Sequence, residues 1–504
     1  MEGRVDSEVS KFMGAWLRRC IHAIWTLALA EVVAVTGGCS THSAAVPTAS
    51  AMASKPEPAP AWEWMSGSEE VNASGAFGTR GLASAANAPA ARYMAASWSD
   101  ADGNLWLFGG TARENSYGDL WRYNSVQKTW EWVAGDPSGG GGCVPGLRGV
   151  AEQRNEPGAR YGSMAWVDRS GVFWVFGGIS GWDGRRSKYL SDLWSFNPRT
   201  GMWAWMGGSP EAPTAGVYGT QGKADAANWP SARYGAVTWR DAQGMFWMFG
   251  GNGYGASADT RDYLSDLWMF NPVTHQWTWM GGTTDLNNRG IYGSMGVPAS
   301  QNLPGARAGA VAWTDNHNHL LLFGGYGYDA AGLLNFLADM WSYDMKAQQW
   351  TWMYGATAVP PKVTRDWIGQ TAVQAVPLYG TYGKRGVTAT TNTPGARAYG
   401  VGWADASGNF WLFGGSLANS GIFNDLWRYQ PSTRQWTWMN GENYVHSSGV
   451  YGNKGGANLS NTPGARSSPA SWTDRKGNLW LFGGDGLGAA GAPGALNDLW
   501  RFHP

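Results

Sequence analysis

The residues best suited to bind a ligand in this sequence are aromatic side chains that stand outside its regular pattern. They are three tryptophans and three tyrosines, namely Trp182, Trp229, Trp367, Tyr254, Tyr326 and Tyr328. Arginines and aspartates flank them along the chain. Flat rings with a polar edge stack on sugars and also anchor protein–protein contacts. We therefore expect these six residues to bind a protein or a glycan; the alternative is that they only pack their own loops.

Histidine and carboxylate patterns predict no catalytic site and no metal site. His317 and His319 flank Asn318 in an expected hairpin turn, where a solvated histidine is more common than a metal ligand. Of the five histidines beyond residue 60, only His446 falls in a long loop. Nucleophile elbows, phosphate-binding loops and zinc signatures are absent from the sequence. We expect no catalytic residue, no metal and no cofactor.

Composition excludes several classes of protein. The chain has 504 residues, with 37 basic and 37 acidic side chains, and it carries 74 Gly and 34 Trp. A formal net charge of zero gives no electrostatic attraction for nucleic acid or for anionic membranes. The apolar content of 43% is far from that of a disordered chain. So many bulky and flexible residues can pack only in a regular architecture.

The regularity is a sixfold repeat of three motifs in one order. Each copy has an Arg that opens a strand-like run ending in Trp, then Phe-Gly-Gly, then Asp-Leu-Trp or, once, Asp-Met-Trp. The arginines are Arg92, Arg160, Arg233, Arg307, Arg397 and Arg466, and the aspartates are Asp119, Asp192, Asp266, Asp339, Asp425 and Asp498. Asp-x-x-Gly separates the first two runs, with Asn318 once in place of Gly, and predicts a tight hairpin that needs a left-handed residue.

A fourth motif, Trp-x-Trp, follows the first five copies, whereas the sixth copy lacks it. The missing pair stands at the other end of the repeats, at Trp62 and Trp64. Aromatic residues alternate with small ones in each run, as in half-buried strands. We therefore predict an all-β, six-bladed β-propeller with four-stranded blades, whose last blade is closed by the N-terminal strand. The four motifs use 29 of the 34 Trp, which we expect to fill the space between blades.

Phe-Gly-Gly followed by Asp-Leu-Trp and Trp-x-Trp resembles the kelch repeat, whose members form β-propellers. The resemblance covers residues 62–502, with repeats longer than the usual ~50 residues. It implies kelch-type blades, and it leaves protein scaffolds, carbohydrate-linked enzymes and copper-radical oxidases open as functions. The histidine positions argue against an oxidase. The recurring Asp-x-x-Gly turn is one residue longer than the Asp box that sialidases carry.

All variation in length falls on one face, which we call the long-loop face. It holds the loops between the second and third strands and the interblade segments, of which five have 27 residues and one, after Trp352, has 44. We expect the interblade segments to form an ordered rim there, although the second departs from the pattern at Cys143 and Pro145. We expect the six Arg–Asp sets to form structural ion pairs at this rim. The long insertion carries Trp367 and is expected to overhang the central pocket or a neighbouring groove.

The N-terminal segment predicts export. Arg18 and Arg19 precede the apolar run Ile21–Val35, and small residues lead to Cys39, as in a secretory signal. The segment resembles the lipobox of bacterial lipoproteins, which implies lipidation at Cys39; a plain cleaved signal or an uncleaved anchor is the alternative. We predict a leader at 1–39, a Ser/Ala/Pro tether at 40–61 and the propeller at 62–504.

These patterns together predict an exported monomer, in the cell envelope or secreted, that binds a protein or a glycan through its long-loop face. Contact with a membrane is expected only through the lipid anchor, and no nucleic acid is expected as a partner. The alternative is a carbohydrate-active enzyme with its site in the central pocket of the long-loop face.

Overall fold

The structure is a computed structural model, and it describes residues 60–113, 115–181, 187–210, 214–365, 371–375, 378–417 and 421–504. The chain divides into two units, Met1–Glu57 and Pro58–Pro504, and the second holds every described residue. Among these residues, no helix is long and apolar enough to cross a membrane.

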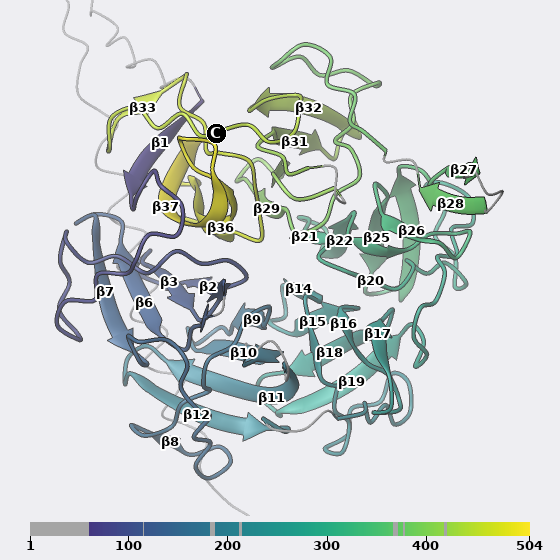
Figure 1. Cartoon of the computed structure of the whole chain (residues 1–504). Coiled ribbons are helices and arrows are strands. Elements are labelled where there is room, and N and C mark those ends of the chain that lie inside the picture. The colour runs from purple at the N-terminus through teal and green to yellow at the C-terminus, as the bar shows by residue number, and fades with distance from the viewer. Residues whose placement is uncertain are drawn as a thin grey trace, which may run out of the picture. The chain divides into compact units, whose positions relative to one another are not determined.

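Each repeat folds into an antiparallel sheet built on four main strands. Figure 1 shows these sheets arranged around a common centre. We call each sheet a blade and number the blades along the chain. Blade one contains β2 (Ala96–Ser99), β3 (Leu105–Phe108), β6 (Leu120–Asn124) and β7 (Thr129–Ala134), and blade two contains β9 (Met164–Val167), β10 (Phe173–Ser180), β11 (Lys188–Asn197) and β12 (Met202–Gly207). Blade three contains β14 (Val237–Arg240), β15 (Phe246–Phe249), β18 (Leu267–Asn271) and β19 (Gln276–Gly281). Blade four contains β21 (Val311–Thr314), β22 (His319–Phe323), β25 (Met340–Asp344) and β26 (Gln349–Tyr354). The fifth is β29 (Val401–Ala404), β30 (Phe410–Phe413), β31 (Leu426–Gln430) and β32 (Gln435–Asn440). The prediction of an all-β propeller is confirmed.

The sixth blade combines strands from both ends of the repeats. It contains β35 (Ala470–Thr473), β36 (Leu479–Leu487), β37 (Pro493–His503) and β1 (Ala61–Ser66). β1 runs antiparallel to β37, with Trp62 opposite Phe502 and Trp64 opposite Trp500. The displaced Trp-x-Trp motif therefore occupies, in this blade, the outer position that the same motif occupies in the others.

A closed ring of backbone hydrogen bonds joins the segments that lead into the innermost strands. In each bond, the amide of one segment donates to the carbonyl of the preceding segment at 2.7–2.9 Å. The pairs are Gly162 to Met94, Gly235 to Gly162, Gly309 to Gly235, Tyr399 to Gly309, Ser468 to Tyr399, and Met94 to Ser468. All six residues have φ between 54° and 66°. This ring sets the blades around a common axis.

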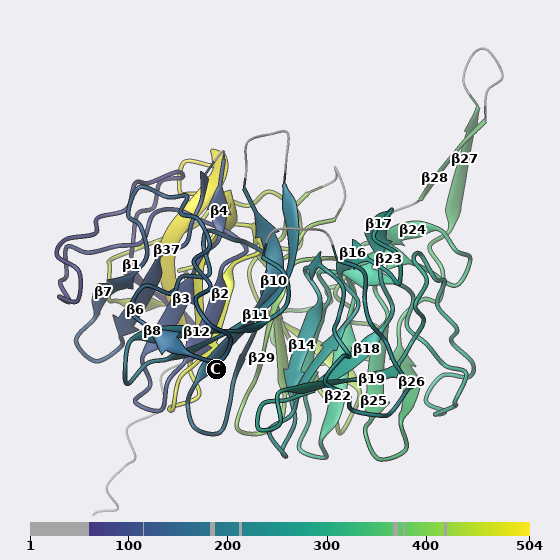
Figure 2. The same cartoon turned by 90° about the horizontal axis from the view of Figure 1, so that it is seen from below.

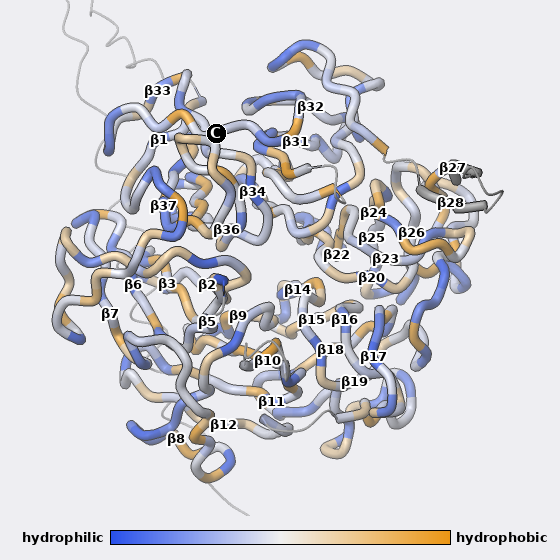
Figure 3. Tube along the Cα trace, viewed as in Figure 1, coloured by the Kyte–Doolittle hydropathy of each residue, from blue (hydrophilic) through white to orange (hydrophobic). Residues whose placement is uncertain are grey.

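Hydrophobic cores lie between neighbouring blades. One cluster joins blades one and two, with Trp98 and Phe173 stacked at 5.1 Å, and corresponding clusters join each later pair of blades. A further cluster joins blade six to blade one, where Trp472 Nε1 donates to the carbonyl of Trp106 at 3.0 Å. Figure 3 shows hydrophobic segments distributed over all the blades. The framework tryptophans thus fill the interblade space, as the sequence predicts.

An aspartate closes the hairpin between the first two strands of each repeat. In blade one, Asp100 Oδ1 accepts the amide of Asn104 at 2.9 Å, and its Oδ2 accepts Trp106 Nε1 at 2.8 Å. In blade four, Leu321 stands at the tryptophan position, and His319 Nδ1 lies 2.8 Å from Asp315 Oδ2, as the side-chain amide of Asn104 does from Asp100 in blade one. Asn318 has φ of 66°, so the predicted left-handed residue is confirmed. His319 therefore stabilises a turn.

The interblade segments do not form the rim expected from the sequence. Each lies along the outermost strand of the following blade, as β8 (Ala151–Glu152) does on β12 and β33 (Ala457–Asn458) does on β1. The Asn of the recurring Asn-x-Pro motif holds it there: the amide of Asn302 donates to the carbonyls of Val297 and Trp350 at 3.0 and 2.9 Å. These segments cover edges that would otherwise be unpaired.

The long insertion after blade four also differs from the prediction. It contains β27 (Pro361–Arg365) and β28 (Thr371–Ala375), which pair with each other as a two-stranded hairpin. Figures 1 and 2 show this hairpin at the outer edge beside β26, standing apart from the blades. The insertion therefore does not overhang the central pocket, and the alternative expectation of a neighbouring groove stays a prediction.

Candidate binding site

Six buried ion pairs underlie the long-loop face. Each arginine that precedes an innermost strand binds the aspartate of its own repeat through both terminal nitrogens, with side chains at most 1% exposed. The pairs, with their shorter N–O distances, are Arg92–Asp119 (2.5 Å), Arg160–Asp192 (2.8 Å), Arg233–Asp266 (2.6 Å), Arg307–Asp339 (2.7 Å), Arg397–Asp425 (2.7 Å) and Arg466–Asp498 (2.6 Å). They are buried rather than placed at a rim, and this burial gives the pairs a structural role in the repeats.

The aspartates also organise the aromatic residues around them. Asp339 Oδ2 accepts Trp341 Nε1 at 2.7 Å and the hydroxyl of Tyr292, from the preceding interblade segment, at 2.7 Å. Burial opposes ionisation of Asp339, but Arg307 and these two donors hold its pKa below the ordinary value. The same hydroxyl contact recurs at Tyr218, Tyr382 and Tyr451. The motif tyrosines are therefore structural.

A second set of tyrosines gathers on the long-loop face near the axis, and we call it the tyrosine cluster. It includes two of the hairpins that extend the loops between second and third strands: β16 (Asn252–Tyr254) with β17 (Arg261–Tyr263), and β23 (Tyr326–Tyr328) with β24 (Leu334–Phe336). Its members are Tyr189, Tyr234, Tyr254, Tyr263, Tyr326, Tyr328 and Tyr399. They come from blades two to five.

Edge-to-face contacts join the rings of the cluster in two groups. The ring of Tyr189 lies 5.6 Å from that of Tyr234 and 5.9 Å from that of Tyr254. The ring of Tyr263 lies 5.6 Å from that of Tyr326 and 6.3 Å from that of Tyr328. Such arrangements fix the rings and leave hydroxyl groups at their edges.

Tyr399 connects the cluster to the central ring of hydrogen bonds. It is one of three non-glycine residues in that ring, and its side chain passes close to Gly309 and Gly235 and hydrogen bonds to that of Tyr234. Burial, together with Tyr234 and Tyr263, raises the pKa of Tyr399 well above its ordinary value. The hydroxyl therefore remains protonated at neutral pH.

Arg261 adds a cation to the cluster. Its guanidinium lies 4.5 Å from the ring centroid of Tyr189, and the side chain is exposed. Hydrogen bonding to Tyr254 raises the pKa of Arg261, although burial opposes this effect. Burial, with Tyr234 nearby, raises the pKa of Tyr189 to about 12. Arg261 thus places a positive charge beside neutral hydroxyl groups, which suits a ligand with acceptor oxygens and a flat or apolar face.

The six aromatic residues that the sequence analysis selected do not all belong to one site. Tyr254, Tyr326 and Tyr328 belong to the tyrosine cluster. Trp229 does not, because its Nε1 donates to the carbonyl of Ser191 at 2.7 Å and its ring packs on the core between blades two and three. The expectation that Trp229 contacts a ligand is therefore corrected. Trp182 and Trp367 lie outside the described residues, as does Cys39.

Sequence patterns missed four members of the cluster: Tyr189, Tyr234, Tyr263 and Tyr399. Tyr234 directly follows a repeat arginine, as Tyr93 and Tyr161 do, so it looks like part of the framework. Tyr399 was the one signal in the sequence that could have indicated the cluster, because three other repeats have Gly at the equivalent position. A bulky residue at a position that favours glycine indicates a special role.

The cavity on the axis itself is small. It has a volume of about 160 Å³ and is lined by the residues of the central ring and their neighbours. Ligand pockets usually occupy about 300–1,000 Å³. In the described part of the chain, no group of three or more His, Cys, Asp or Glu residues could hold a metal ion. This geometry favours binding on the surface of the long-loop face.

Antiparallel blades, buried Arg–Asp pairs and loops gathered on one face define a β-propeller scaffold. The sequence matches the KLHDC2/KLHL20/DRC7 Kelch-repeats domain over residues 79–286 and again over residues 147–366, which together span more than half of the chain. The second match begins 68 residues after the first, equal to the spacing from Arg92 to Arg160, so the two are offset by one repeat. The chain belongs to the kelch-repeat family.

Proposed function

We propose that this kelch-repeat propeller is an exported binding module that holds a protein segment or a glycan on its tyrosine cluster. The observation that carries the proposal is the exposed guanidinium of Arg261 beside the ring of Tyr189, which contacts the ring of Tyr254. Tyrosine and arginine are the residue types most often found at binding hot spots, because they combine large contact area with directed hydrogen bonds. Membership of the kelch-repeat family supports a protein segment as the first ligand to test.

Two features make a carbohydrate-active enzyme the weaker candidate. The axial cavity of about 160 Å³ is too small to enclose a sugar chain. A glycosidase also needs two facing carboxylates. Asp262 lies on the cluster hairpin, but Asn287 Nδ2 donates to its Oδ2 at 2.9 Å and holds it in a structural contact.

Binding is tested by screening the purified chain against a peptide library and a glycan array. Arg261→Ala should weaken binding of any ligand found by at least tenfold, because the cation that the described residues place beside the tyrosine cluster is lost. Arg199→Ala is the matched control, since Arg199 is an exposed arginine in the turn between β11 and β12, on the opposite face. Equal weakening by both variants, or none by Arg261→Ala, would show that the wrong face has been chosen.

Export is proposed on the N-terminal sequence alone: Arg18, Arg19, the apolar run Ile21–Val35 and Cys39. Mass spectrometry of the N-terminal peptide from the native host tests it. A lipidated Cys39 as first residue supports a lipoprotein of the cell envelope. An unmodified N-terminus at another small residue supports a secreted protein, and an intact Met1 contradicts export by cleavage.

A further inference from the structure

The second interblade segment is the one that departs from the repeat, at Cys143 and Pro145. In four other segments, a tyrosine hydroxyl donates to the buried aspartate of the following blade. Pro145 takes the place of that tyrosine, so Asp192 is not contacted in this way. The departure changes the surroundings of the Arg160–Asp192 pair.

Arg160 differs from the other five repeat arginines at its Nε. In the others, Nε donates to the carbonyl two residues earlier, at 2.9–3.2 Å. In the second repeat, the residue two positions before the arginine is Gly158, which has φ of 78°. The equivalent residues of the other repeats do not have a positive φ, so the backbone of Gly158 runs in a different direction. Arg160 instead donates through Nη2 to the carbonyl of Pro157, and its Nε has no hydrogen-bond partner although the residue is only 1% exposed. A buried donor without a partner is costly.

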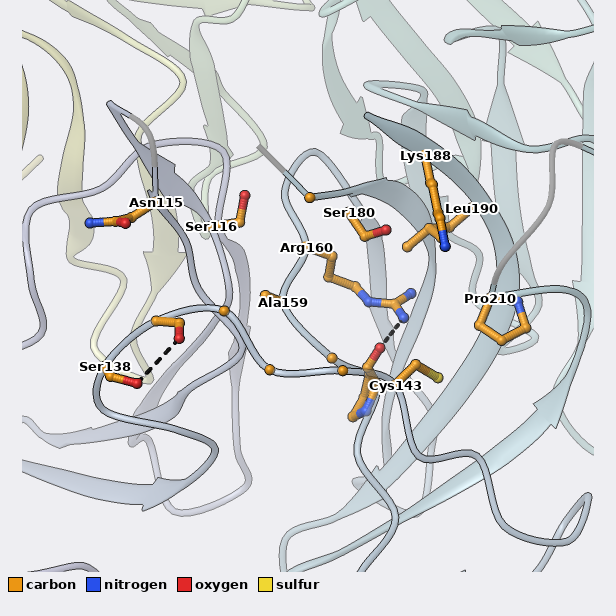
Figure 4. Close-up of a pocket in the computed structure, with 17 residues that line it drawn as sticks. Asn115, Ser116, Ser138, Cys143, Ala159, Arg160, Ser180, Lys188, Leu190 and Pro210 are labelled. Atoms are coloured by element: carbon orange, nitrogen blue, oxygen red, sulfur yellow. Dashed lines mark hydrogen bonds between the residues drawn. The ribbon is translucent and has the colours of Figure 1, made fainter. Parts of the chain in front are cut away.

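This arginine lines a pocket between blades one and two. The pocket has a volume of about 660 Å³, within the range of ligand sites. Figure 4 shows Arg160 at its centre, with β5 (Asn115–Ser116) on one side and Lys188 on the other. Ser116 Oγ is a second buried polar atom without a partner, and Ser116 is 6% exposed.

The lining favours a negatively charged, hydroxyl-rich molecule. Asp192 already neutralises Arg160, so Lys188 supplies the net positive charge. Among the described lining residues there is no carboxylate. Ser138 and Ser180 add hydroxyl groups, and the glycine run 139–142 leaves the floor free of side chains.

We propose that this pocket binds a small sugar bearing an oxyanion, either a carboxylate or a phosphate. The oxyanion would pair with Lys188 Nζ, and oxygens of the ligand would accept from Arg160 Nε and exchange hydrogen bonds with Ser116 Oγ. Charge-assisted hydrogen bonds of this kind are the stronger ones in proteins. No tyrosine of the cluster lines this pocket, and the proposal does not depend on the function proposed for the cluster.

The test uses the full chain with three probes: sodium D-glucuronate, glucose 6-phosphate and D-glucose. Calorimetry should detect at least one of the charged sugars, with glucose binding at least tenfold more weakly. Lys188→Ala should weaken the charged sugar at least tenfold, and Ser116→Ala by several-fold. Lys223→Ala, at an exposed lysine in the interblade segment before blade three, should have no effect. Binding of one charged sugar and not the other identifies the oxyanion.

A second measurement locates the site independently. Cys143 lines the pocket, so its alkylation, followed by peptide mapping, should slow in the presence of the sugar that binds. Failure of both charged sugars to bind, equal binding of glucose, or unchanged affinity in Lys188→Ala would overturn the proposal. An unchanged thermal melting curve for each variant shows that a loss of binding is not a loss of folding.

Discussion

Glu63 on β1 accepts a hydrogen bond from Arg501 Nε on β37 at 3.1 Å, although 438 residues separate them in the sequence. The carboxylate is 4% exposed and also lies 3.4 Å from His503 Nε2 and 3.9 Å from Lys128 Nζ. Burial opposes its ionisation, but the hydrogen bonds from His503 and Arg501 outweigh this effect and hold the pKa of Glu63 below its ordinary value. The two ends of the repeats are thus joined by a buried charge pair.

This pair predicts a pH-dependent contribution to stability. A carboxyl whose pKa is lowered in the folded state stabilises it above the unfolded pKa, and this stabilisation is lost as pH falls through the folded pKa. Glu63→Gln should therefore destabilise the protein by about 1–3 kcal/mol at pH 7. The difference in the free energy of unfolding between Glu63→Gln and the wild type, measured by urea unfolding, should become smaller below about pH 4.5. Glu131→Gln, at the more exposed Arg122–Glu131 pair of blade one, should cost only about 0–1 kcal/mol.

Removal of β1 should open the sixth blade. A chain beginning at residue 67 lacks Trp62, which is 0% exposed, and leaves one edge of β37 unpaired. We expect a loss of several kcal/mol and a tendency to aggregate. A chain beginning at Pro58 keeps β1 and should melt as the full chain does. Equal melting temperatures for the two truncations would contradict a structural role for β1.

The central ring contains residues in a backbone conformation that favours glycine. Ser468 has φ of 54°, whereas Gly235 occupies the equivalent position with φ of 64°. Ser468→Gly should stabilise the protein by about 0.5–1 kcal/mol. The backbone strain that the substitution relieves in the folded state is larger than the extra conformational entropy that a glycine loses on folding. Gly235→Ser should have the opposite sign. Thermal melting of both variants checks the pair, and shifts of the same sign would refute the argument.

The aspartate–tyrosine contact can be removed in one blade and added in another. Tyr292→Phe should cost about 1–2 kcal/mol, because Asp339 loses the hydroxyl that donates at 2.7 Å. Phe77 occupies the same place in blade one, with its ring 4.8 Å from Trp121 at 48°, the geometry of Tyr292 on Trp341. Phe77→Tyr should therefore gain a bond to Asp119 and stabilise the protein by about 1 kcal/mol. A destabilised Phe77→Tyr would show that the hydroxyl does not fit there.

Strands and turns could be predicted because their signals are local. Asp315 and Asn318 form one hairpin, and the alternation that ends in Trp313 marks the strand before it. The interblade segments were misplaced because their partners are remote. Asn302 holds its segment on the carbonyl of Trp350, 48 residues later, and no local pattern specifies that contact.

The candidate sites were also predicted only in part, because some of their features have local sequence signals and others depend on remote contacts. The sequence identified Tyr254 and Tyr326 as residues outside the framework, but Trp229 met the same criterion and packs in a core. It also marked Cys143 and Pro145 as a departure from the repeat. It did not indicate that the departure leaves Arg160 Nε without a partner, beside Lys188.

The sequence alone determined the all-β class, the repeat and the tryptophan framework, because residue alternation and turn chemistry act between neighbours along the chain. Tertiary structure decided which side chains meet near the axis and between blades. Tyr399 reaches Tyr234 only because six backbone hydrogen bonds, ending with Met94 to Ser468, bring distant repeats around one centre. Contacts of that kind depend on how the blades pack on one another, which motif spacing within a repeat does not encode.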